Sequence, residues 1–258
     1  MITTATTITD THPRRRLAPE QDHGRRQRDR RTAGAFLASA GAGVLMAIIT
    51  AEALYPASYD TADNTISDLG ATLPPESIVL QPSATIFNVA MIVGGLAIIT
   101  GAFYMHRAFG RKSVAIPLTL FGVGALGVGI FPGNHLAPHQ LFAMTAFISG
   151  GVTAVMAARV LVPPFRQLSV IVGTISLVSF MLAMFLLEWT PVAELGEGGI
   201  ERWIVYPAVL WLTMFGGALM GTRDATIRSD DFPARDGGVV DRGDGHLRGA
   251  AGRAESRH

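Results

Sequence analysis

The chain has 258 residues, of which 49% are hydrophobic and only 16% charged, and its formal net charge is +1 at pH 7. A soluble domain carries about 25% charged residues, so this composition argues against one. The absence of cysteine excludes disulfides, thiolate nucleophiles and cysteine-ligated metals. The sequence also lacks a phosphate-binding Gly-Lys-Ser/Thr loop, a Gly-x-Ser-x-Gly elbow and a His-Glu-x-x-His zinc motif.

The N-terminal segment, residues 1–32, is polar and contains eight arginines. No apolar period runs through it, so it is predicted to be a disordered cytoplasmic tail. A basic tail of this kind either anchors the topology or contacts anionic lipid headgroups. A nucleic-acid partner is not expected.

Six apolar runs follow, each long enough for a helix that crosses a bilayer, which needs about 20 residues. They cover residues 33–54, 83–105, 113–131, 139–162, 168–187 and 203–221. Because lipid does not tolerate open backbone, these runs must be helices. The predicted fold class is therefore all-α, a polytopic transmembrane bundle of six helices with disordered cytoplasmic tails. Residues 33–221 form the transmembrane domain, and the apolar-poor residues 222–258 form the second tail.

The basic residues predict the orientation of this bundle. Of the 21 Lys and Arg residues, 20 lie in segments 1–32, 106–112, 159–166 and 222–258, all on one side of the predicted spans. Cytoplasmic segments of membrane proteins carry this excess. The chain is therefore predicted to lie in the cell membrane as a multi-pass protein with both termini in the cytoplasm.

Glycines recur within three of the predicted spans. They are Gly122, Gly124, Gly127 and Gly129, then Gly150 and Gly151, and finally the small-xxx-small pair Gly217 and Gly221. Small residues let helix backbones approach closely in lipid, so we interpret them as packing positions. A glycine-lined substrate pathway is the functional alternative.

Several polar residues map to the predicted outer face, and ionisable groups at membrane depth are costly enough to mark candidate sites. The candidate cluster consists of Ser67, Asp68, Asn88, His139, Glu201 and Arg202. Each has a structural alternative. Ser67-Asp68 would cap a short helix, Asn88 would bond a neighbouring helix, and Glu201-Arg202 would form an interfacial ion pair.

Arg202 is the only basic residue on this acidic face, so a charge partner is expected. Asp68, Glu52 and Glu188 are the candidates. We predict that Asp68, His139, Glu201 and Arg202 converge in one polar pocket.

His135 and His139 have the i,i+4 spacing that places two imidazoles on one helical face, as zinc sites require. Pro138 lies between them, and helices accept proline in their first turn. A helix that begins near Ala137 would leave His135 in the loop and off that face. Under a metal-binding hypothesis the ligands would be Asp68, His135 and His139.

Four segments in order carry a family resemblance. They are Asn64-Thr65-Ile66-Ser67-Asp68-Leu69-Gly70, Ile86-Phe87-Asn88, Gly129-Ile130-Phe131-Pro132 followed by His139, and Glu201-Arg202-Trp203-Ile204-Val205-Tyr206-Pro207. Over roughly residues 36–221 the chain resembles the DUF998 family of six-span prokaryotic membrane proteins of unknown function. The resemblance implies a fold and a membrane location but no reaction. A looser similarity links the chain to seven-span membrane hydrolases that hold zinc with Ser, Asp and His.

Two functions from different classes follow. The first is a non-enzymatic integral membrane protein with a transport, lipid-handling or accessory role, whose outer cluster is a structural network or a binding site; it requires no cofactor. The alternative is a metal-dependent hydrolase embedded in the membrane and acting at the outer leaflet. There zinc on Asp68, His135 and His139 would activate a water, and Arg202 would bind an anionic headgroup. The sequence assigns no catalytic residue.

Overall fold

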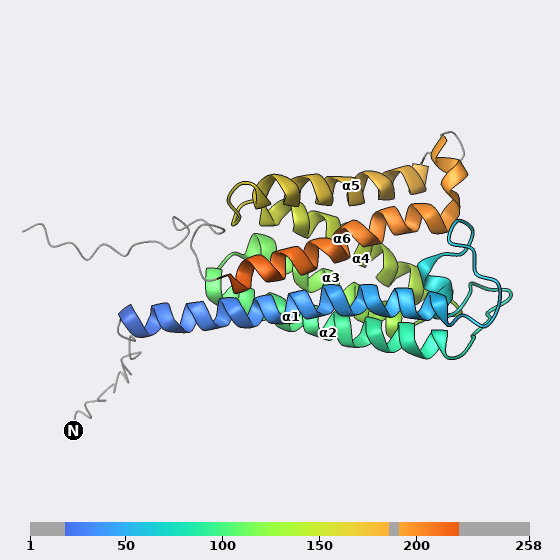
Figure 1. Ribbon diagram of the computed structural model, residues 1–258, viewed down its shortest axis with the longest axis horizontal. Coiled ribbons are helices and arrows are strands. Elements are labelled where there is room, and N and C mark those ends of the chain that lie inside the picture. Colours follow the sequence, from blue (N-terminus) through green and yellow to red (C-terminus); the bar gives the residue numbers. More distant parts are fainter. Residues whose placement is uncertain (1–18, 186–190, 222–258) are drawn as a thin grey trace, which may run out of the picture.

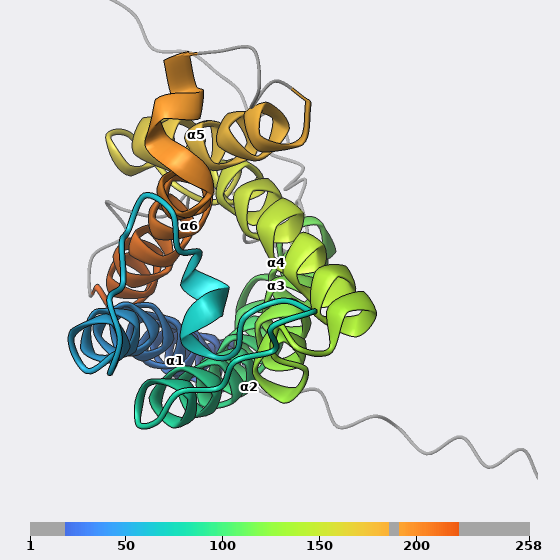
Figure 2. The ribbon, with the colours of Figure 1, turned by 90° about the vertical axis from the view of Figure 1, so that its right-hand side faces the viewer.

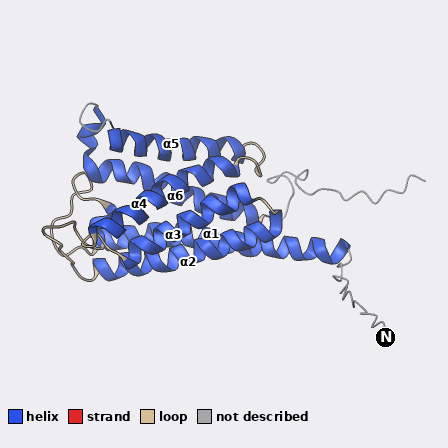
Figure 3. Cartoon of the chain, turned by 180° about the vertical axis from the view of Figure 1, so that it is seen from behind, coloured by secondary structure: helices blue, strands red, loops and turns tan. Residues whose placement is uncertain are grey.

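The computed structural model describes residues 19–185 and 191–221. Within these ranges the chain forms helices and no strand (Figure 3). The long helices are α1 (Pro19–Ala53), α2 (Ser83–Phe109), α3 (Lys112–Ile130), α4 (Leu136–Ala157), α5 (Phe165–Phe185) and α6 (Gly196–Met220). Two short 3₁₀ helices, η1 (Ile66–Leu69) and η3 (Pro191–Leu195), lie in the connections.

The six long helices run along a common direction as a bundle (Figure 1). Each packs against its neighbours in the chain, and α1 closes the set by packing against α6, while α4 barely touches α6. The helices therefore form a closed ring, as the end-on view shows (Figure 2). We call the end that carries the connection between α1 and α2 the loop end; α1 begins and α6 finishes at the opposite end (Figure 1).

The six predicted spans are confirmed as helices that are long and apolar enough to cross a membrane. Large apolar side chains also cover the outside of the bundle, such as Val93 of α2 and Leu141 of α4, with exposed fractions of 60% and 64%. Exposed apolar surface on this scale is typical of a surface that lipid solvates rather than water. The chain is a multi-pass integral membrane protein in contact with the bilayer.

The first helix begins earlier than the sequence indicated. It starts at Pro19, so residues 19–32 of the predicted disordered tail are helical. Contacts with distant residues explain the extension: the buried carboxylate of Asp29 accepts a hydrogen bond from Arg107 Nε at 3.1 Å, and buried Arg30 donates to the carbonyl at the C-terminal end of α6. The predictions of disorder for residues 1–18 and 222–258 fall outside the described residues.

The last helix also begins earlier, at Gly196 rather than near Trp203. Glu201 and Arg202 therefore lie in its second turn instead of at its first residues. Successive residues of an α-helix are rotated by about 100° around its axis. The two adjacent side chains must point toward different neighbours, and this rotation determines the arrangement of the site.

Glycine positions confirm the packing interpretation for the centre of the bundle. A methyl group placed on Gly122 of α3 would lie 2.8 Å from the carbonyl oxygen of Gly95 in α2, so the two backbones nearly touch. The predicted Gly217 pair is wrong in detail, because a methyl group there would meet nothing within 4 Å. Its neighbour Gly216 instead packs against Gly34 of α1, and this contact closes the ring.

Candidate functional site

The connection between α1 and α2 turns back into the loop end of the ring. Its 3₁₀ helix η1 contacts α1, α2 and α6, and it lies inside the ring when the molecule is viewed from the loop end (Figure 2). Ile66 and Leu69 are buried there, with exposed fractions of 3% and 1%. These two apolar side chains hold η1 in place as a plug, so its polar residues are presented at fixed positions.

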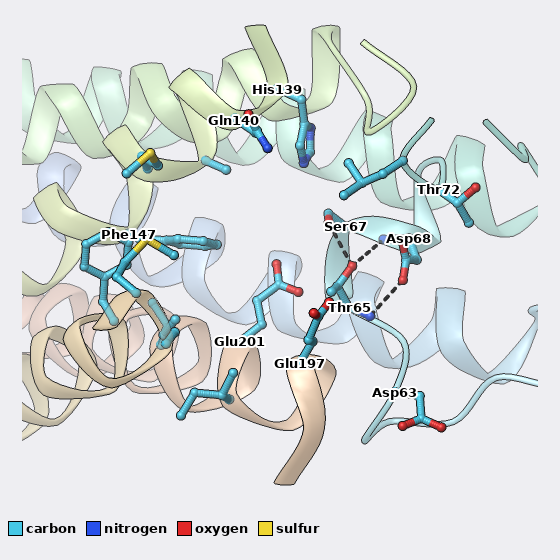
Figure 4. A pocket seen from close by; sticks show the side chains of 18 of the residues that line it. Asp63, Thr65, Ser67, Asp68, Thr72, His139, Gln140, Phe147, Glu197 and Glu201 are labelled. Atoms are coloured by element: carbon cyan, nitrogen blue, oxygen red, sulfur yellow. Dashed lines mark hydrogen bonds between the residues drawn. The ribbon is translucent and has the colours of Figure 1, made fainter. Parts of the chain in front are cut away.

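A capping box stabilises η1. Thr65 is the N-cap: its hydroxyl accepts from Asp68 N at 3.2 Å, and the Asp68 carboxylate accepts from Thr65 N at 2.8 Å. The hydroxyls of Thr65 and Ser67 lie 3.0 Å apart (Figure 4). The capping alternative is thus confirmed in part: Asp68 is the reciprocal acid of the box, but Thr65, rather than Ser67 or Asp68, is the N-cap.

Arg202 makes a dense set of hydrogen bonds on one side of α6. Its guanidinium donates to the carboxylate of Glu52, to the hydroxyl of Tyr59 at 2.8 Å, and to the carbonyl oxygens of Thr61, Asn64 and Gly198 at 2.9, 3.0 and 2.8 Å. Only 11% of the Arg202 side chain is exposed. The residue therefore ties α1, the loop and α6 together.

This arrangement selects one of the three predicted partners of Arg202. Glu52 forms the ion pair, Asp68 does not, and Glu188 lies outside the described residues. The arrangement gives no support to Arg202 as a site for an anionic headgroup, because its charge is already paired with Glu52.

Tyr59 belongs to the same network. Its hydroxyl donates to the carbonyl oxygen of Thr65 at 2.8 Å while accepting from Arg202, whose guanidinium carbon lies 5.6 Å from the Tyr59 ring centroid. Burial raises the pKa of Tyr59 well above 10, although the nearby Arg202 charge opposes the shift. The tyrosine therefore stays protonated and keeps its donor role at physiological pH.

Two glycines allow the loop to approach the start of α6. Gly196 has a positive φ of 70°, and a methyl group on Gly198 would lie 2.0 Å from the carbonyl oxygen of Asn64. The Gly198 amide donates to the carbonyl oxygen of Ala62 at 2.8 Å. Any side chain at Gly198 would push away the backbone whose carbonyls Arg202 binds.

Glu201 points to the other side of α6. Its carboxylate accepts from the Ile66 amide at 2.6 Å, which satisfies the first amide of η1. Figure 4 shows the Glu201 carboxylate directed into a cavity, with the side chains of His139 and Gln140 from α4 entering from the facing side. Adjacent residues in α6 thus belong to two different environments.

His139 is buried, with 4% of its surface exposed. Its Nδ1 lies 2.9 Å from the carbonyl oxygen of Phe131. A carbonyl only accepts, so Nδ1 must donate, and in the neutral ring Nε2 is then an acceptor. Within residues 19–185 and 191–221, no hydrogen-bond partner lies at Nε2.

The cavity has a volume of about 770 Å³ and is bounded by the loop and by α4, α5 and α6. We call it the loop-end cavity. Its polar lining consists of Asp63, Thr65, Ser67, Asp68, Thr72, Glu76, His139, Gln140, Glu197 and Glu201. Its apolar lining consists of Leu73, Ile78, Ala143, Met144, Phe147, Phe180, Ala183, Met184, Ile200 and Ile204. One wall is therefore polar and acidic, and the other is apolar.

A smaller chamber of about 60 Å³ lies deeper, among apolar side chains at the centre of the ring. Ser67, His139, Phe147 and Glu201 line both spaces, together with Ala143 and Ile204. The polar groups thus sit where the loop-end cavity meets the apolar interior.

The six candidate cluster residues therefore separate. Ser67, Asp68, His139 and Glu201 line the loop-end cavity, whereas Arg202 and Asn88 do not. Asn88 Nδ2 lies 3.5 Å from the carbonyl oxygen of Gly70, so it meets the loop rather than the neighbouring helix that we expected. Its Oδ1 is buried without a partner in the described part of the chain.

The proposed zinc ligands do not assemble. Among the residues that the structure describes, no three His, Asp or Glu side chains gather closely enough to hold a metal ion. His135 precedes α4, as the position of Pro138 suggested, and it is exposed with its ring packed edge-on against Phe131. Asp68, His135 and His139 therefore give the zinc hypothesis no ready-made ligand set.

Some lining residues were missed, and two of them carried a readable signal. The pattern Thr65-x-x-Asp68 is a capping box in the sequence itself. Glu197 lies four residues before Glu201 and so shares its helical face. Recognising that face required knowing that α6 begins at Gly196. Gln140 and Tyr59 gave no comparable signal.

Comparison with known proteins places the chain in a family without supplying a function. No curated protein and no solved structure matches it. Residues 39–218, which include all the lining residues named above, match the family described as protein of unknown function (DUF998). The match covers well over half of the chain and agrees with the resemblance in the four sequence segments, so the chain belongs to the DUF998 family.

Proposed function

We propose that this protein is a lipid-handling membrane protein that binds an amphipathic molecule in the loop-end cavity. The observation that carries the proposal is the two-sided lining of that cavity, with carboxylates and His139 on one wall and apolar side chains on the other. A volume of about 770 Å³ falls within the range of about 300–1,000 Å³ that is common for small-molecule sites. A molecule with a polar head and an apolar chain matches both walls.

Access from the bilayer supports this proposal. Deeper in the bundle α4 and α5 pack tightly, since a methyl group on Gly173 would lie 2.8 Å from the carbonyl oxygen of Gly151. Toward the loop end, Met144 of α4 and Met184 of α5 line the cavity, yet 43% and 51% of their surfaces are exposed. This exposure supports a lateral opening of the cavity between α4 and α5, which we propose as the entry from the bilayer. An amphiphile in the bilayer would enter sideways, with its chain between the two methionines.

We further propose that the loop end faces the outside of the cell membrane and that both termini are cytoplasmic, because the basic residues gather at the opposite end. There Arg25, Arg28 and Arg31 of α1 are exposed, where anionic headgroups would contact them. The substitutions Ser58→Cys and Ser113→Cys test this orientation, because both serines are exposed, at opposite ends. An impermeant thiol reagent added to intact cells should label only Ser58→Cys; labelling of Ser113→Cys alone would reverse the orientation.

The binding proposal is tested with a photoactivatable hexadecanol probe and the purified protein in nanodiscs. Crosslinks should concentrate on the peptides that contain Met144 and Met184. The substitution Ala143→Trp fills the cavity and should remove these crosslinks. Ala137→Trp, also in α4 but at an exposed position away from the cavity, should keep them. Crosslinks spread evenly over all lipid-facing helices and unchanged by Ala143→Trp would overturn the proposal.

A further inference from the structure

Among the described residues, the charged side chains that line the loop-end cavity are all acids. They are Asp63, Asp68, Glu76, Glu197 and Glu201, and neither Lys nor Arg is among the lining residues. Acidic side chains alone do not establish a preference, because the protein uses some of them internally. The acceptor capacity that each group has left for a ligand decides the preference.

The two carboxylates next to η1 keep acceptor capacity. Asp68 uses one oxygen to accept from Thr65 N, and Glu201 accepts from the backbone amides of Ile66 and Ser67. An ionised carboxylate offers about four acceptor positions over its two oxygens. Capping η1 therefore leaves acceptor positions on both residues for a ligand.

His139 adds an independent acceptor. It is 4% exposed, Figure 4 shows its ring directed into the cavity, and the Phe131 carbonyl holds Nδ1 as the donor. Its Nε2 makes no hydrogen bond to the described part of the chain, and His139 lines the cavity. A ligand that donates a hydrogen bond at this point would supply a partner.

Among the described residues no cation lines this negative wall, although the neighbouring Arg202 charge still acts on Glu201 from outside the cavity. Arg202 faces away and is paired with Glu52 and three backbone carbonyls. A carboxylate or phosphate head would meet acceptors and like charges and would lose its water without compensation. A positive head with N–H donors meets complementary groups.

We infer that the head selected by the loop-end cavity is a primary ammonium group attached to an apolar chain. This inference rests on the proposed function and names its ligand class. The ammonium supplies three N–H donors and one positive charge, which suit His139 Nε2 and the carboxylates of Glu201 and Asp68. The apolar chain runs along the α4 and α5 wall toward Met144 and Met184.

The test is a competition assay in nanodiscs against the photoactivatable hexadecanol probe. The competitors share one chain and differ in the head: dodecylamine, dodecyltrimethylammonium, dodecanol and dodecanoate. Ethylamine carries the head without the chain. We expect dodecylamine to compete about tenfold better than dodecanol, as a charge-assisted hydrogen bond predicts. Dodecyltrimethylammonium, which has charge but no donor, should fall between them, and both dodecanoate and ethylamine should compete least.

Variants connect that preference to named groups. Glu201→Gln should reduce the preference for dodecylamine to below about threefold. Glu197 is an exposed lining residue, so Glu197→Gln tests the same charge without disturbing the buried part of the site. It should weaken the preference measurably. Glu194→Gln removes an exposed acid one turn away that does not line the cavity, and it should change nothing.

The outcomes separate this inference from the proposed function. If no dodecyl compound displaces the probe, the proposed function fails. If all heads compete equally, or dodecanoate competes best, amphiphile binding stands and the ammonium inference is overturned. Equal competition by dodecyltrimethylammonium would reject the donor requirement. Equal competition by ethylamine would show a soluble amine as the ligand and contradict the lipid-handling role.

Discussion

Glu201 and Arg202 are neighbours in the sequence, but their side chains lie in different environments on opposite sides of α6. Arg202 makes five hydrogen bonds to protein groups, one of them to an acid of opposite charge. Glu201 accepts from the amides of Ile66 and Ser67 in η1 and otherwise faces the loop-end cavity beside His139. The comparison shows that a charged residue at membrane depth is not by itself a binding site. It becomes a candidate when the bonds it makes within the protein leave some of its donors or acceptors unpaired.

Disrupting the hydrogen-bond network of Arg202 should produce the largest loss of stability. Arg202→Ala leaves the Glu52 carboxylate without its counter-charge, and both side chains are largely buried, 11% and 20% exposed. Removing one partner of a buried pair costs about 3–5 kcal/mol. The free energy of unfolding, measured by titrating the protein with SDS in mixed micelles, should fall by about this amount. Arg202→Lys should cost less, because it keeps the charge but loses the planar fork.

A double-mutant cycle sharpens this expectation. Arg202→Ala combined with Glu52→Gln should cost clearly less than the sum of the two single changes, because the uncompensated charge is gone. Additive costs would show that Arg202 stabilises the loop only through its backbone carbonyl bonds.

Gly198→Ala, next to the Arg202 network, should cause the next largest loss of stability. The added methyl group would lie 2.0 Å from the Asn64 carbonyl, and this neighbour is backbone and cannot turn away. Overpacking of this kind costs about 1–3 kcal/mol. The matched control is Gly217→Ala in the same helix, where nothing lies within 4 Å; it should be neutral or stabilise by up to about 1 kcal/mol. The same SDS titration measures both, and equal effects would contradict the proposed close approach.

The cap of η1 lies between the Arg202 network and the loop-end cavity, and its removal should cause a moderate loss of stability. Thr65→Ala deletes the hydroxyl that accepts from Asp68 N and should cost about 1 kcal/mol of unfolding free energy. Thr65→Ser keeps the hydroxyl and should retain most of that stability. Because η1 positions the amide that Glu201 binds, Thr65→Ala should also weaken dodecylamine competition. A loss of stability with unchanged competition would separate the cap from the site.

The smallest effect concerns pH. The pKa of Tyr59 is raised above 10 in the folded protein by burial, so the unfolded tyrosine releases its proton first. The stability that the protonated hydroxyl contributes is complete below pH 10 and is lost as pH rises toward the folded pKa. Between pH 10 and 11 the wild type should lose at most about 1 kcal/mol more than Tyr59→Phe does. Parallel profiles for the two proteins would refute this role, since the raised pKa of Tyr55 is common to both.

The sequence predicts the spans well and the ends of the helices poorly, for a physical reason. Hydropathy reports only residues that meet lipid, so it places the six spans but misses the polar first turns of α1 and α6. In α6 the glycines before Glu201 read as loop residues. In the structure the loop backbone lies against that turn. The Asn64 carbonyl occupies the space that a side chain at position 198 would need, so only glycine fits there.

The partner of Arg202 shows a second limit. Topology indicates which residues reach the same face of the membrane, and it correctly brought Asp68, His139 and Glu201 to one cavity. It does not give their direction around the ring. Because α6 packs against α1, Arg202 meets Glu52 of α1, while η1 uses Asp68 for its own cap. The order of the helices in the ring, which the spans alone do not encode, decided between the two acids.

The closure of the ring by α1 and α6 has a consequence for how the protein is made. The loop that forms the plug emerges from the ribosome early, yet some of the residues that hold it belong to the last helix. Ile66 and Glu201 are 135 positions apart, and Glu52 and Arg202 are 150 positions apart. During synthesis an intermediate with five inserted helices therefore has an open seam and a plug held only by the earlier helices, such as α1 and α2. Insertion of the sixth helix closes the seam and, in the same step, supplies the partners of Glu52 and of the Ile66 amide.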